Sequence, residues 1–549
     1  MRGPGIGLPA EHRPRRVAAR SAAWSSDRVR FAVGSNAGIL LRRAVAGLGL
    51  LAVTALSGRG LTEPPPADAV PPAASAAATA STTAAASAPA PAATLDAAKI
   101  REAVRELASD AAKWGGTAGA MVVEIPSGAV LASESEHAAM NPASNAKLPT
   151  AAAALRLLGP DHRYLTGLYG KIRGDRVAAL VLRGSGDPTL ASAHLAEMAR
   201  DLAARGVRKV DAILVDQGAF DDAFTPPAFA QQPNEWAPFR APVSAVAVDA
   251  NTVVITAQPS EDGKPALVRV EPPGVAKVVG SVRTTKKGDP EKFGLSMSAS
   301  GGALTIKVSG HVPEDGDPVR AWRRLEDPRL APGHALRAAL SAAGIEAGEV
   351  RAGGEKEKAL LAAHRSEPLA HVLARLGKES DNFVAEMVFK SLAAEKAPRP
   401  ATFGAAADLV TTELKAMGAF EPGCVVANGS GLFDANRTTA AATAALLRGA
   451  YLDSRIGPEM VAHLAVGGVD GTLRSRFKAW SKARAVRAKT GTLNAVFALS
   501  GYVLPPPGKP AVAFALFVNG APGKAGAARA SIDRVVDAVA RASWGAPPR

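Results

Sequence analysis

The sequence predicts an α/β protein in which one domain is interrupted by an inserted β-rich module. Three observations lead to this fold class. Helical periodicity occurs towards both ends of the folded chain, a hairpin of two strands lies beside a helix at each end, and the long middle alternates short apolar runs with Gly, Pro and Asp turns. The order of these elements therefore indicates two halves of one α/β domain that flank the insertion.

The composition is that of a globular chain with room for several domains. The 549 residues are 47% hydrophobic and 21% charged, which excludes a fully disordered chain, a collagen-like fibre and a polytopic membrane protein. The single cysteine, Cys424, excludes an internal disulfide framework and a cysteine-based zinc cluster. The nine histidines form no HExxH or HxH pattern, so a metallohydrolase has no support in the sequence.

The positive charge is concentrated at the N-terminus. The formal net charge is +15, and residues 1–60 hold ten arginines against only Glu11 and Asp27, a net charge of +8. The remaining excess is too dilute to predict a nucleic-acid partner, and no stretch interleaves basic and aromatic residues. It is compatible with an anionic polymer as partner.

Residues 1–60 are predicted to be a leader with a signal peptide. Arg42 and Arg43 precede an apolar run from Ala44 to Leu56, whose thirteen residues are too few to span a bilayer but match a signal-peptide core. The alternative is a buried helix of the mature protein. Residues 61–94 oppose it, because this Ala- and Pro-rich segment cannot bury enough apolar surface to fold and is expected to be a disordered linker. We therefore expect an exported protein, periplasmic or associated with the cell envelope, without an integral membrane span in its mature form.

The first half of the folded domain is predicted to be a helix, a hairpin and a second helix. Thr94 or Asp96 provides an N-cap for the first helix. The apolar residues expected on its buried face are Ile100, Val104, Leu107 and Ala111. Residues 120–125 and 129–133 flank a Pro-Ser-Gly turn and predict the hairpin, and residues 144–158 predict the second helix.

The middle of the chain is predicted to be mostly strands and the last part mostly helices. The clearest strands are Val177–Leu182, Ala212–Val215, Thr252–Ala257 and Leu304–Val308. Residues 366–450 return to a helical pattern. Residues 496–504 and 511–518 then predict a second hairpin, and residues 526–543 predict a C-terminal helix.

Three short motifs of chemically useful residues occur in order along the chain. They are the SxxK pair of Ser144 and Lys147, the triplet Ser380-Asp381-Asn382 and the triplet Lys489-Thr490-Gly491. Each motif is weak alone, and the chain contains a decoy SxxK in Ser475 and Lys478, which lacks the downstream order and is expected in a solvated loop. The occurrence of the three motifs in this order makes a chance match improbable.

The residue types in these motifs suit nucleophilic catalysis by a serine. A serine hydroxyl needs a nearby base, and Ser144 and Lys147 lie three residues apart on one face at a helix start. Lys147 must be partly neutral to act as that base, which burial or a second cation such as Lys489 brings about. A KTG sequence on an edge strand presents an amine, a hydroxyl and an uncluttered backbone to a substrate. Pro149 fits this scheme only if the Asn145 carbonyl lies in the first, unbonded turn of the helix.

As an ordered set, SxxK, SDN and KTG resemble the motifs of the penicillin-recognising serine acyltransferases. The flanking residues narrow the resemblance to the class C low-molecular-mass penicillin-binding proteins, the D-Ala-D-Ala carboxypeptidase/endopeptidase family of the penicillin-binding protein 4 type (peptidase family S13). The similar stretches are residues 141–147, 157–160, 186–190, 241–245, 429–432, 436–437, 468–474 and 488–493. Two positions depart from the family pattern: Ser185 stands where a glycine is usual, and Asn428 stands where an aspartate is common.

The resemblance implies a serine β-lactamase/DD-peptidase-like domain, an antiparallel sheet flanked by helices, with a β-rich two-domain insertion. Ser144 and Ser380 are 236 residues apart, which leaves room for that insertion. The implied division of the chain is a leader and signal peptide (1–60), a linker (61–94), the first part of the transpeptidase-like domain (95–170), the inserted domains (171–355, the inner one at about 250–317) and the second part (356–549).

The resemblance also implies a role for each motif residue. Ser144 attacks the carbonyl between two D-alanines and forms an acyl-enzyme, with Lys147 as general base. Ser380 and Lys489 relay a proton to the leaving amine, while Asn382 orients the substrate amide. Thr490, Gly491 and Thr492 bind the substrate, the two threonines at its carboxylate, and the N–H groups of Ser144 and Thr492 form the oxyanion hole. No metal or organic cofactor is required.

The expected function is therefore a serine DD-peptidase that acts on peptidoglycan stem peptides and is inhibited by β-lactams. It would hydrolyse D-Ala-D-Ala as a carboxypeptidase, cross-links from D-Ala to meso-diaminopimelate as an endopeptidase, or both. One alternative is a β-lactamase, which needs a water-activating glutamate and is weakly opposed by the long insertion. Another is a catalytically silent peptidoglycan-binding scaffold, which the three intact motifs oppose. The balance of the two peptidase activities, the third stem-peptide residue and the oligomeric state stay open.

Other conspicuous residues have simpler interpretations. Asp187, which precedes a proline, is expected to form a turn rather than to catalyse. Residues 429–431 have the wrong spacing for a GxSxG nucleophile and are expected to form a tight turn near the site. Cys424 is expected to be a small buried apolar residue.

Overall fold

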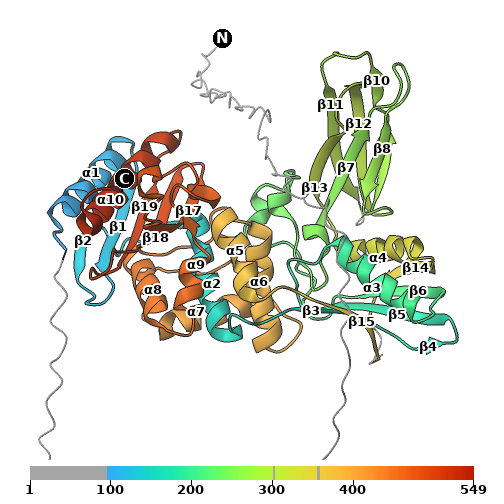
Figure 1. Ribbon diagram of the computed structural model, residues 1–549, viewed down its shortest axis with the longest axis horizontal. Helices are drawn as coiled ribbons and strands as arrows, with labels where there is room; N and C mark the ends of the chain where they lie inside the picture. Colours follow the sequence, from blue (N-terminus) through green and yellow to red (C-terminus); the bar gives the residue numbers. More distant parts are fainter. Residues whose placement is uncertain (1–94, 301–302, 355–358, 549) are drawn as a thin grey trace, which may run out of the picture. The chain divides into compact units, whose positions relative to one another are not determined.

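The computed structural model describes residues 95–300, 303–354 and 359–548 (Figure 1). The leader and linker predicted for residues 1–94, including Thr94, lie outside the described residues. No helix among the described residues combines the length and the apolar character that a membrane crossing requires.

A six-stranded antiparallel sheet joins the two halves of the predicted α/β domain (Figure 1). Its strand order is β16-β17-β18-β19-β1-β2, so two strands from the start of the chain extend a sheet built by its last part. The bounds are β1 Thr117–Glu124, β2 Val130–Glu134, β16 Ala465–Val466, β17 Val486–Leu493, β18 Val496–Val503 and β19 Val512–Asn519. Both predicted hairpins are confirmed, because β1 pairs with β2 and β18 pairs with β19 in antiparallel register.

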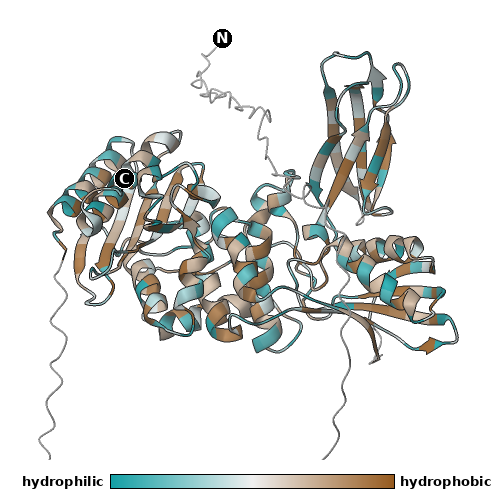
Figure 2. Cartoon of the chain, viewed as in Figure 1, coloured by the Kyte–Doolittle hydropathy of each residue, from teal (hydrophilic) through white to brown (hydrophobic). Residues whose placement is uncertain are grey.

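Helices cover both faces of this sheet. Alternate side chains of β19 show this: Phe514 and Leu516 pack in a cluster with α1 and α10, whereas Phe517 packs in a cluster with α8. The helices are α1 Ala98–Lys113, α8 Ala440–Leu452 and α10 Ala525–Trp544. The central strands are apolar at consecutive positions for this reason, and Figure 2 shows brown along them. The predicted apolar face of α1 is buried. The prediction of Asp96 as the N-cap is wrong by one residue, because the N-cap is Ala97, although Asp96 Oδ1 does accept a hydrogen bond from the Ala98 N–H at 3.0 Å.

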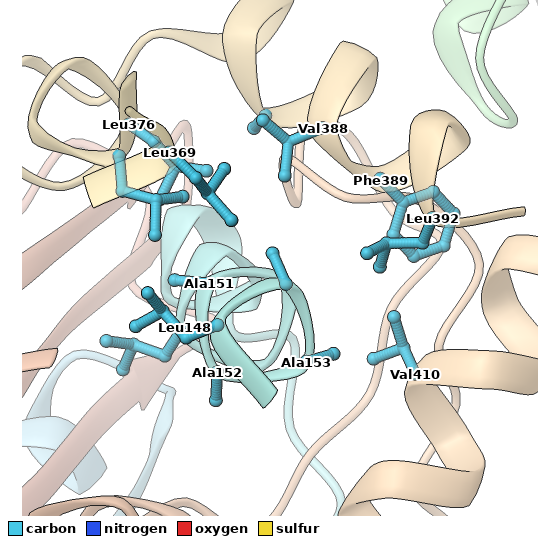
Figure 3. Close-up of a cluster of buried hydrophobic side chains, with 14 of the residues drawn as sticks. Leu148, Ala151, Ala152, Ala153, Leu369, Leu376, Val388, Phe389, Leu392 and Val410 are labelled. Atoms are coloured by element: carbon cyan, nitrogen blue, oxygen red, sulfur yellow. The ribbon is translucent and has the colours of Figure 1, made fainter. Parts of the chain in front are cut away.

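The second helix of the chain, α2, lies inside a helical layer on the α8 side. Figure 3 shows its alanines 151, 152 and 153 among side chains from α5, α6 and α7. The elements of this layer are η1 Ala143–Ala146, α2 Lys147–Leu158, α5 Leu369–Ala374, the π-helical turn η5 Arg375–Glu379, α6 Asn382–Lys396, α7 Phe403–Ala416 and α9 Gly457–Ala462. Small side chains allow these helices to approach α2 closely, so its start is fixed by packing. Pro149 is the third residue of α2, in the first turn, where the missing N–H leaves no acceptor unpaired.

A second six-stranded sheet is formed within the long segment between the motifs. Its order is β14-β6-β5-β3-β15, with β4 beside β5, and the pairs β14–β6 and β5–β6 are parallel. The bounds are β3 Leu165–Tyr169, β4 Ile172–Arg173, β5 Arg176–Gly184, β6 Lys209–Asp216, β14 Glu346–Ala352 and β15 Leu360–Arg365. Two helices that the sequence analysis did not predict, α3 Ser192–Ala204 and α4 Ala331–Ala342, pack on it. Parallel pairs need crossover connections, which these helices provide.

An inner pair of small sheets encloses its own apolar core. One has the order β13-β7-β8, and the other has the order β10-β12-β11 with β9 also on β12. The bounds are β7 Thr252–Gln258, β8 Leu267–Glu271, β9 Ala276–Gly280, β10 Arg283–Thr285, β11 Lys292–Ser300, β12 Ala303–Pro313 and β13 Val319–Arg324. Val253, Ile255, Ile306 and Val308 are in this core.

The sheets extend a few residues beyond the predicted domain limits. The outer inserted sheet runs from Leu165 to Arg365, and the inner sheets run from Thr252 to Arg324. The predicted limits of 171–355 and about 250–317 missed β3, β15 and β13, because pairing with distant strands leaves no local signal. We keep the division into domains as a proposal. The remaining short helical turns are η2 Phe229–Gln231, η3 Pro238–Arg240, η4 Asp249–Asn251, η6 Gly471–Leu473 and η7 Lys478–Trp480.

Candidate active site

Ser144 lies in a short turn whose entry is held by polar contacts. It belongs to the 3-10 turn η1, and Lys147 is the first residue of α2, so the SxxK pair spans the junction of the two elements. Asn141 Oδ1 accepts a hydrogen bond from the Ala143 N–H at 2.8 Å, where Ala143 has a φ of 46°. The Asn141 N–H in turn donates to Asn519 Oδ1 at 2.8 Å. These contacts tie the Ser144 turn to the end of β19.

The Lys147 amine is fully buried among three oxygen atoms. Its Nζ lies 3.2 Å from Ser144 Oγ, 2.7 Å from Asn382 Oδ1 and 2.7 Å from the Ser430 carbonyl oxygen. An amide oxygen and a carbonyl oxygen only accept hydrogen bonds, so they take both N–H groups of a neutral amine. The lone pair of that amine then faces Ser144 Oγ, whose O–H can donate to it.

The charge of Lys147 is set by burial and by two carboxylates. Desolvation lowers the pKa of Lys147 to about 7, although Glu386 and Asp381 favour the charged form. Glu386 is buried as well, and its oxygens accept hydrogen bonds from the N–H groups of Gly429 (3.1 Å) and Ser430 (2.8 Å). Burial raises the pKa of Glu386. Lys147 is therefore partly neutral near pH 7, as a general base must be.

Ser380 and Asn382 reach the site through a sharp change of direction between two helices. The π-helical turn η5 ends at Glu379, and Ser380 follows it with the left-handed φ of 62°. Asp381 caps α6, because its Oδ1 accepts a hydrogen bond from the Val384 N–H at 3.1 Å, while its Oδ2 pairs with Arg375 at 2.8 Å. Asn382 is consequently the first residue of α6, where its Oδ1 contacts Lys147.

Lys489 forms a second lysine–serine pair beside the first. Its Nζ donates to Ser380 Oγ at 2.8 Å and to the Thr490 carbonyl oxygen at 2.7 Å. Lys489 is fully buried, and desolvation together with the charge of Lys147 lowers its pKa well below the usual range. The three motifs, distant in sequence, are thus brought into one cluster.

One edge of β17 is left partly unpaired, because the neighbouring strand β16 is only two residues long. The prediction that KTG lies on an edge strand is wrong for the sheet order, because β16 lies outside β17. However, β16 pairs only with Arg487 and Ala488. Within the part of the chain that the structure describes, no strand pairs with residues 489–493 on that side, so this stretch has the open backbone of an edge strand.

Gly491 allows β17 to pass close to the Ser144 turn. A Cβ atom at this position would lie 2.8 Å from the Pro142 carbonyl oxygen, closer than real Cβ contacts. Thr490 Oγ1 donates to Thr472 Oγ1 at 3.0 Å, and Thr492 is exposed. The substrate-binding roles of residues 490–492 stay predictions.

Glu386 is a group of the site that the sequence analysis missed, and the contact of the Ser430 carbonyl with Lys147 was not predicted. Nothing in the sequence marks Glu386, which lies in the middle of a buried helix four residues after Asn382. The tight turn at residues 429–431 was predicted near the site, and this prediction is confirmed because the Ser430 carbonyl contacts Lys147. Asn428, one of the two departures from the family pattern, supports the turn, since its Oδ1 accepts a hydrogen bond from the Gly431 N–H at 2.9 Å.

The simpler interpretations of other residues are mostly confirmed. Asp187 forms a turn, because its Oδ1 accepts hydrogen bonds from the Thr189 N–H (2.8 Å) and hydroxyl (2.7 Å). Ser475 and Lys478 are exposed and lie away from regular strands. The expectation that Cys424 is buried is wrong: the residue is half-buried, because it lies in the irregular loop between α7 and α8.

The cluster can perform nucleophilic attack by a serine on an acyl group. It contains a hydroxyl beside a partly neutral amine, a second lysine–serine pair and an open strand for an extended substrate. Among the described residues, His, Cys, Asp and Glu side chains form no group of three that could hold a metal ion.

Comparison with known proteins gives a consistent result. The sequence profile of the D-Ala-D-Ala carboxypeptidase 3 (S13) family matches residues 100–541. A D-alanyl-D-alanine carboxypeptidase from Actinomadura sp. (strain R39) is 34% identical over 448 residues, which cover 78% of this chain and 82% of that protein. A carboxypeptidase DacB from Mycolicibacterium smegmatis is 27% identical over 420 residues, 73% of this chain and 76% of that protein.

The fold also matches a solved structure. Penicillin-binding protein 4 from Haemophilus influenzae superimposes with a TM-score of 0.67 and 24% sequence identity, covering 79% of this chain and 99% of that one. The predicted fold class, a sheet flanked by helices with an inserted module, is confirmed by this likeness and by the sheets described above.

Proposed function

Because the chain belongs to the D-Ala-D-Ala carboxypeptidase (S13) family, we propose that its serine DD-peptidase activity on peptidoglycan is carried out by the cluster around Ser144. One observation carries this assignment: Ser144 Oγ lies 3.2 Å from the Lys147 Nζ, whose other two hydrogen-bonding positions are filled by acceptors. That arrangement leaves the lone pair of a neutral Lys147 directed at the serine hydroxyl.

In the acylation step, Ser144 Oγ attacks the carbonyl carbon of the penultimate D-alanine. Lys147 Nζ takes the hydroxyl proton as the new C–O bond forms, and the C–N bond to the last D-alanine then breaks. The negative charge on the carbonyl oxygen is met by the N–H groups of Ser144 and Thr492. The products of this step are an ester on Ser144 and, once its nitrogen is protonated, a free D-alanine.

The leaving amine needs a proton, which Ser380 and Lys489 are placed to deliver. Lys489 Nζ donates to Ser380 Oγ at 2.8 Å, so a proton passed by the serine hydroxyl to the amine can be replaced from the lysine. Asn382 holds Lys147 through its Oδ1, and its amide nitrogen donates to the Phe239 carbonyl at 3.3 Å. Water then hydrolyses the ester and restores Ser144.

We assign the terminal carboxylate of the substrate to the residues of β17 that face the site. Thr490 and Thr492 supply hydroxyls, and Gly491 lets the strand lie against the Ser144 turn. Lys489 adds a positive charge only in its protonated form, which its burial disfavours. A β-lactam presents a carboxylate and a strained amide in a similar arrangement, so we propose that β-lactams acylate Ser144 and inhibit the enzyme. We also propose that the protein is exported, since its polymer substrate is in the cell wall.

Release of D-alanine tests the proposed roles. A peptide that ends in D-Ala-D-Ala should lose its last residue with the parent protein and keep it with Ser144→Ala. A matched control is Ser475→Ala, which removes the serine of the decoy motif and should leave the rate unchanged. Full activity in Ser144→Ala would exclude the assignment.

A further inference from the structure

The two faces of the three-stranded sheet β13-β7-β8 differ in character. One face is apolar and buried, and the other carries aromatic and charged side chains. Strand register places Trp322 and Arg320 on the same side of β13, and Arg320 lies level with Thr256 on β7 and Arg269 on β8. The side chains of the opposite face, such as Ile255, are buried in the inner core. The outer face is therefore not part of the core of this sheet.

The outer face exposes a large aromatic ring beside two guanidinium groups. Trp322 is 48% exposed, and Arg320 and Arg269 are also exposed. Arg269 donates to the Gln258 side-chain oxygen at 3.1 Å, and within the described ranges neither arginine is in an ion pair with a carboxylate. The exposed Glu271 lies level with Trp322 on the same face, because both residues pair with Val254 of β7. The face thus offers a flat aromatic surface, two guanidinium groups and one carboxylate to a partner.

This face continues towards the active site through one short segment. At the next position on the same side of β13, Arg324 stacks over the ring of Trp236 at 4.5 Å. Trp236 precedes the turn η3, whose residue Phe239 accepts the hydrogen bond from the Asn382 amide at its carbonyl oxygen. The segment of η3 therefore connects β13 with the start of α6, and its residue Phe239 is itself 46% exposed.

We propose that the outer face of β13-β7-β8, centred on Trp322, Arg320 and Arg269, binds the peptidoglycan polymer and holds it while a stem peptide occupies the active site. The proposal rests on the DD-peptidase function. Trp322 stacks on the C–H faces of sugar rings in the glycan strand, as an amphipathic ring does at exposed polar surfaces. Arg320 and Arg269 pair with carboxylates of neighbouring stem peptides.

The test measures binding to purified intact sacculi in a Ser144→Ala background, so that the polymer is not cleaved. Trp322→Ala should weaken co-sedimentation with sacculi by about fivefold, the scale of one aromatic contact, and Trp322→Phe should restore most of it. Arg320→Ala should weaken binding to intact sacculi but not to sacculi whose stem peptides have been removed. The Trp322→Ala loss should persist on those stripped sacculi.

Two controls separate this proposal from the catalytic one. Arg176 lies on β5, outside the proposed surface, and its side chain is 59% exposed. The Arg176→Ala variant should therefore leave sacculus binding unchanged. With Ser144 intact, Trp322→Ala should release D-alanine from a small D-Ala-D-Ala peptide at the parent rate but act more slowly on sacculi. Failure of the parent on the small peptide would contradict the proposed function alone.

Unchanged sacculus binding in the Trp322→Ala, Arg320→Ala double variant would overturn the proposal. So would an equal loss in Arg176→Ala, because it would reveal general charge attraction. A Trp322 effect that disappears on stripped sacculi would overturn the assignment of the ring to sugars.

Discussion

At the scale of single residues, the proposed mechanism depends on the protonation of one buried amine. Lys147 is surrounded by acceptors on two sides and by Ser144 on the third, and its pKa of about 7 comes mainly from desolvation. The charge of Glu386 favours the ammonium form of Lys147. Glu386 also accepts a hydrogen bond from the N–H of Ser430, the residue whose carbonyl contacts Lys147. If Lys147 is the general base, as we propose, changes in its surroundings should move the pH range of activity.

We predict that acylation depends on the neutral form of Lys147. The rate of acylation by penicillin should rise with pH and level off above about 7, because the base must lose its proton before it can accept one from Ser144. Lys147→Met keeps the length but removes the amine, and should slow acylation by about a thousandfold. Stopped-flow measurements across pH 5 to 9 check both; a rate independent of pH in that range would contradict this account.

We predict that Glu386→Gln shifts this profile to lower pH. Loss of the buried negative charge removes an interaction that favours the ammonium form, so the pKa of Lys147 falls further. The glutamine can accept only one of the two N–H groups at residues 429 and 430, so the free energy of unfolding should also fall by about 1–3 kcal/mol. A profile displaced to higher pH would show that Glu386 acts in another way.

At the scale of secondary-structure elements, the site is assembled where three elements begin or end. Ser144 precedes α2, Ser380 follows the turn η5 and Asn382 begins α6, while β17 supplies Lys489 from a stretch that β16 leaves unpaired. A local interaction holds each of these positions. Asn141 binds the Ser144 turn, Asp381 caps α6, and the absence of a side chain at Gly491 lets β17 approach the turn. These features determine geometry more than stability.

We predict that Asp381→Ala affects the active site more than the fold. It removes the N-cap of α6 and the ion pair with Arg375, and should lower the free energy of unfolding by about 1 kcal/mol. The same change frees the backbone between Ser380 and Asn382, so kcat/KM should fall by a larger factor than the stability loss explains. Thermal unfolding and D-alanine release, measured together, check this; Thr402→Ala, which removes the equivalent cap of α7, is the matched control.

We predict that Gly491→Ala separates β17 from the Ser144 turn. The added Cβ would lie 2.8 Å from the Pro142 carbonyl oxygen and 3.0 Å from the Ala498 Cβ, and the first of these is backbone that cannot move aside easily. Acylation by penicillin should be nearly lost while the far-UV circular dichroism stays native. Gly526→Ala, where the added Cβ meets nothing within 4 Å, should leave acylation unchanged.

At the scale of the whole molecule, stability should depend on pH through buried bases. His463 is 2% exposed, and desolvation lowers its pKa to about 4 from an ordinary value of 6.5. Between pH 4 and 6.5 the unfolded chain therefore binds more protons at this residue than the folded chain, so the contribution of His463 to stability falls as the pH is lowered through that window. In urea unfolding, His463→Asn should flatten the stability curve between pH 4 and 6.5 relative to the parent; an unchanged slope would contradict the assignment.

The sequence allowed the main architecture and the motif residues to be predicted, because these leave local signals. The buried face of α1 follows from its spacing, the hairpins follow from their turns, and the motif order brought together Ser144, Ser380 and Lys489. Contacts between distant segments leave no such signal. Glu386 looks like any residue of a buried helix, and the exposure of Cys424 depends on a loop without periodicity. The helices α3 and α4 are a different case, because their Ala- and Leu-rich sequences carry a helical pattern that the prediction of a strand-rich middle passed over.

One measurement tests the central claim, that Ser144 is the nucleophile of this site. The protein and its Ser144→Ala variant are incubated with penicillin, and the intact mass of each is recorded, followed by peptide mapping of any adduct. We predict one penicilloyl group per chain of the parent, located on Ser144, with slow release, and none on the variant. An adduct on the variant, or no adduct on a folded parent, would contradict the account.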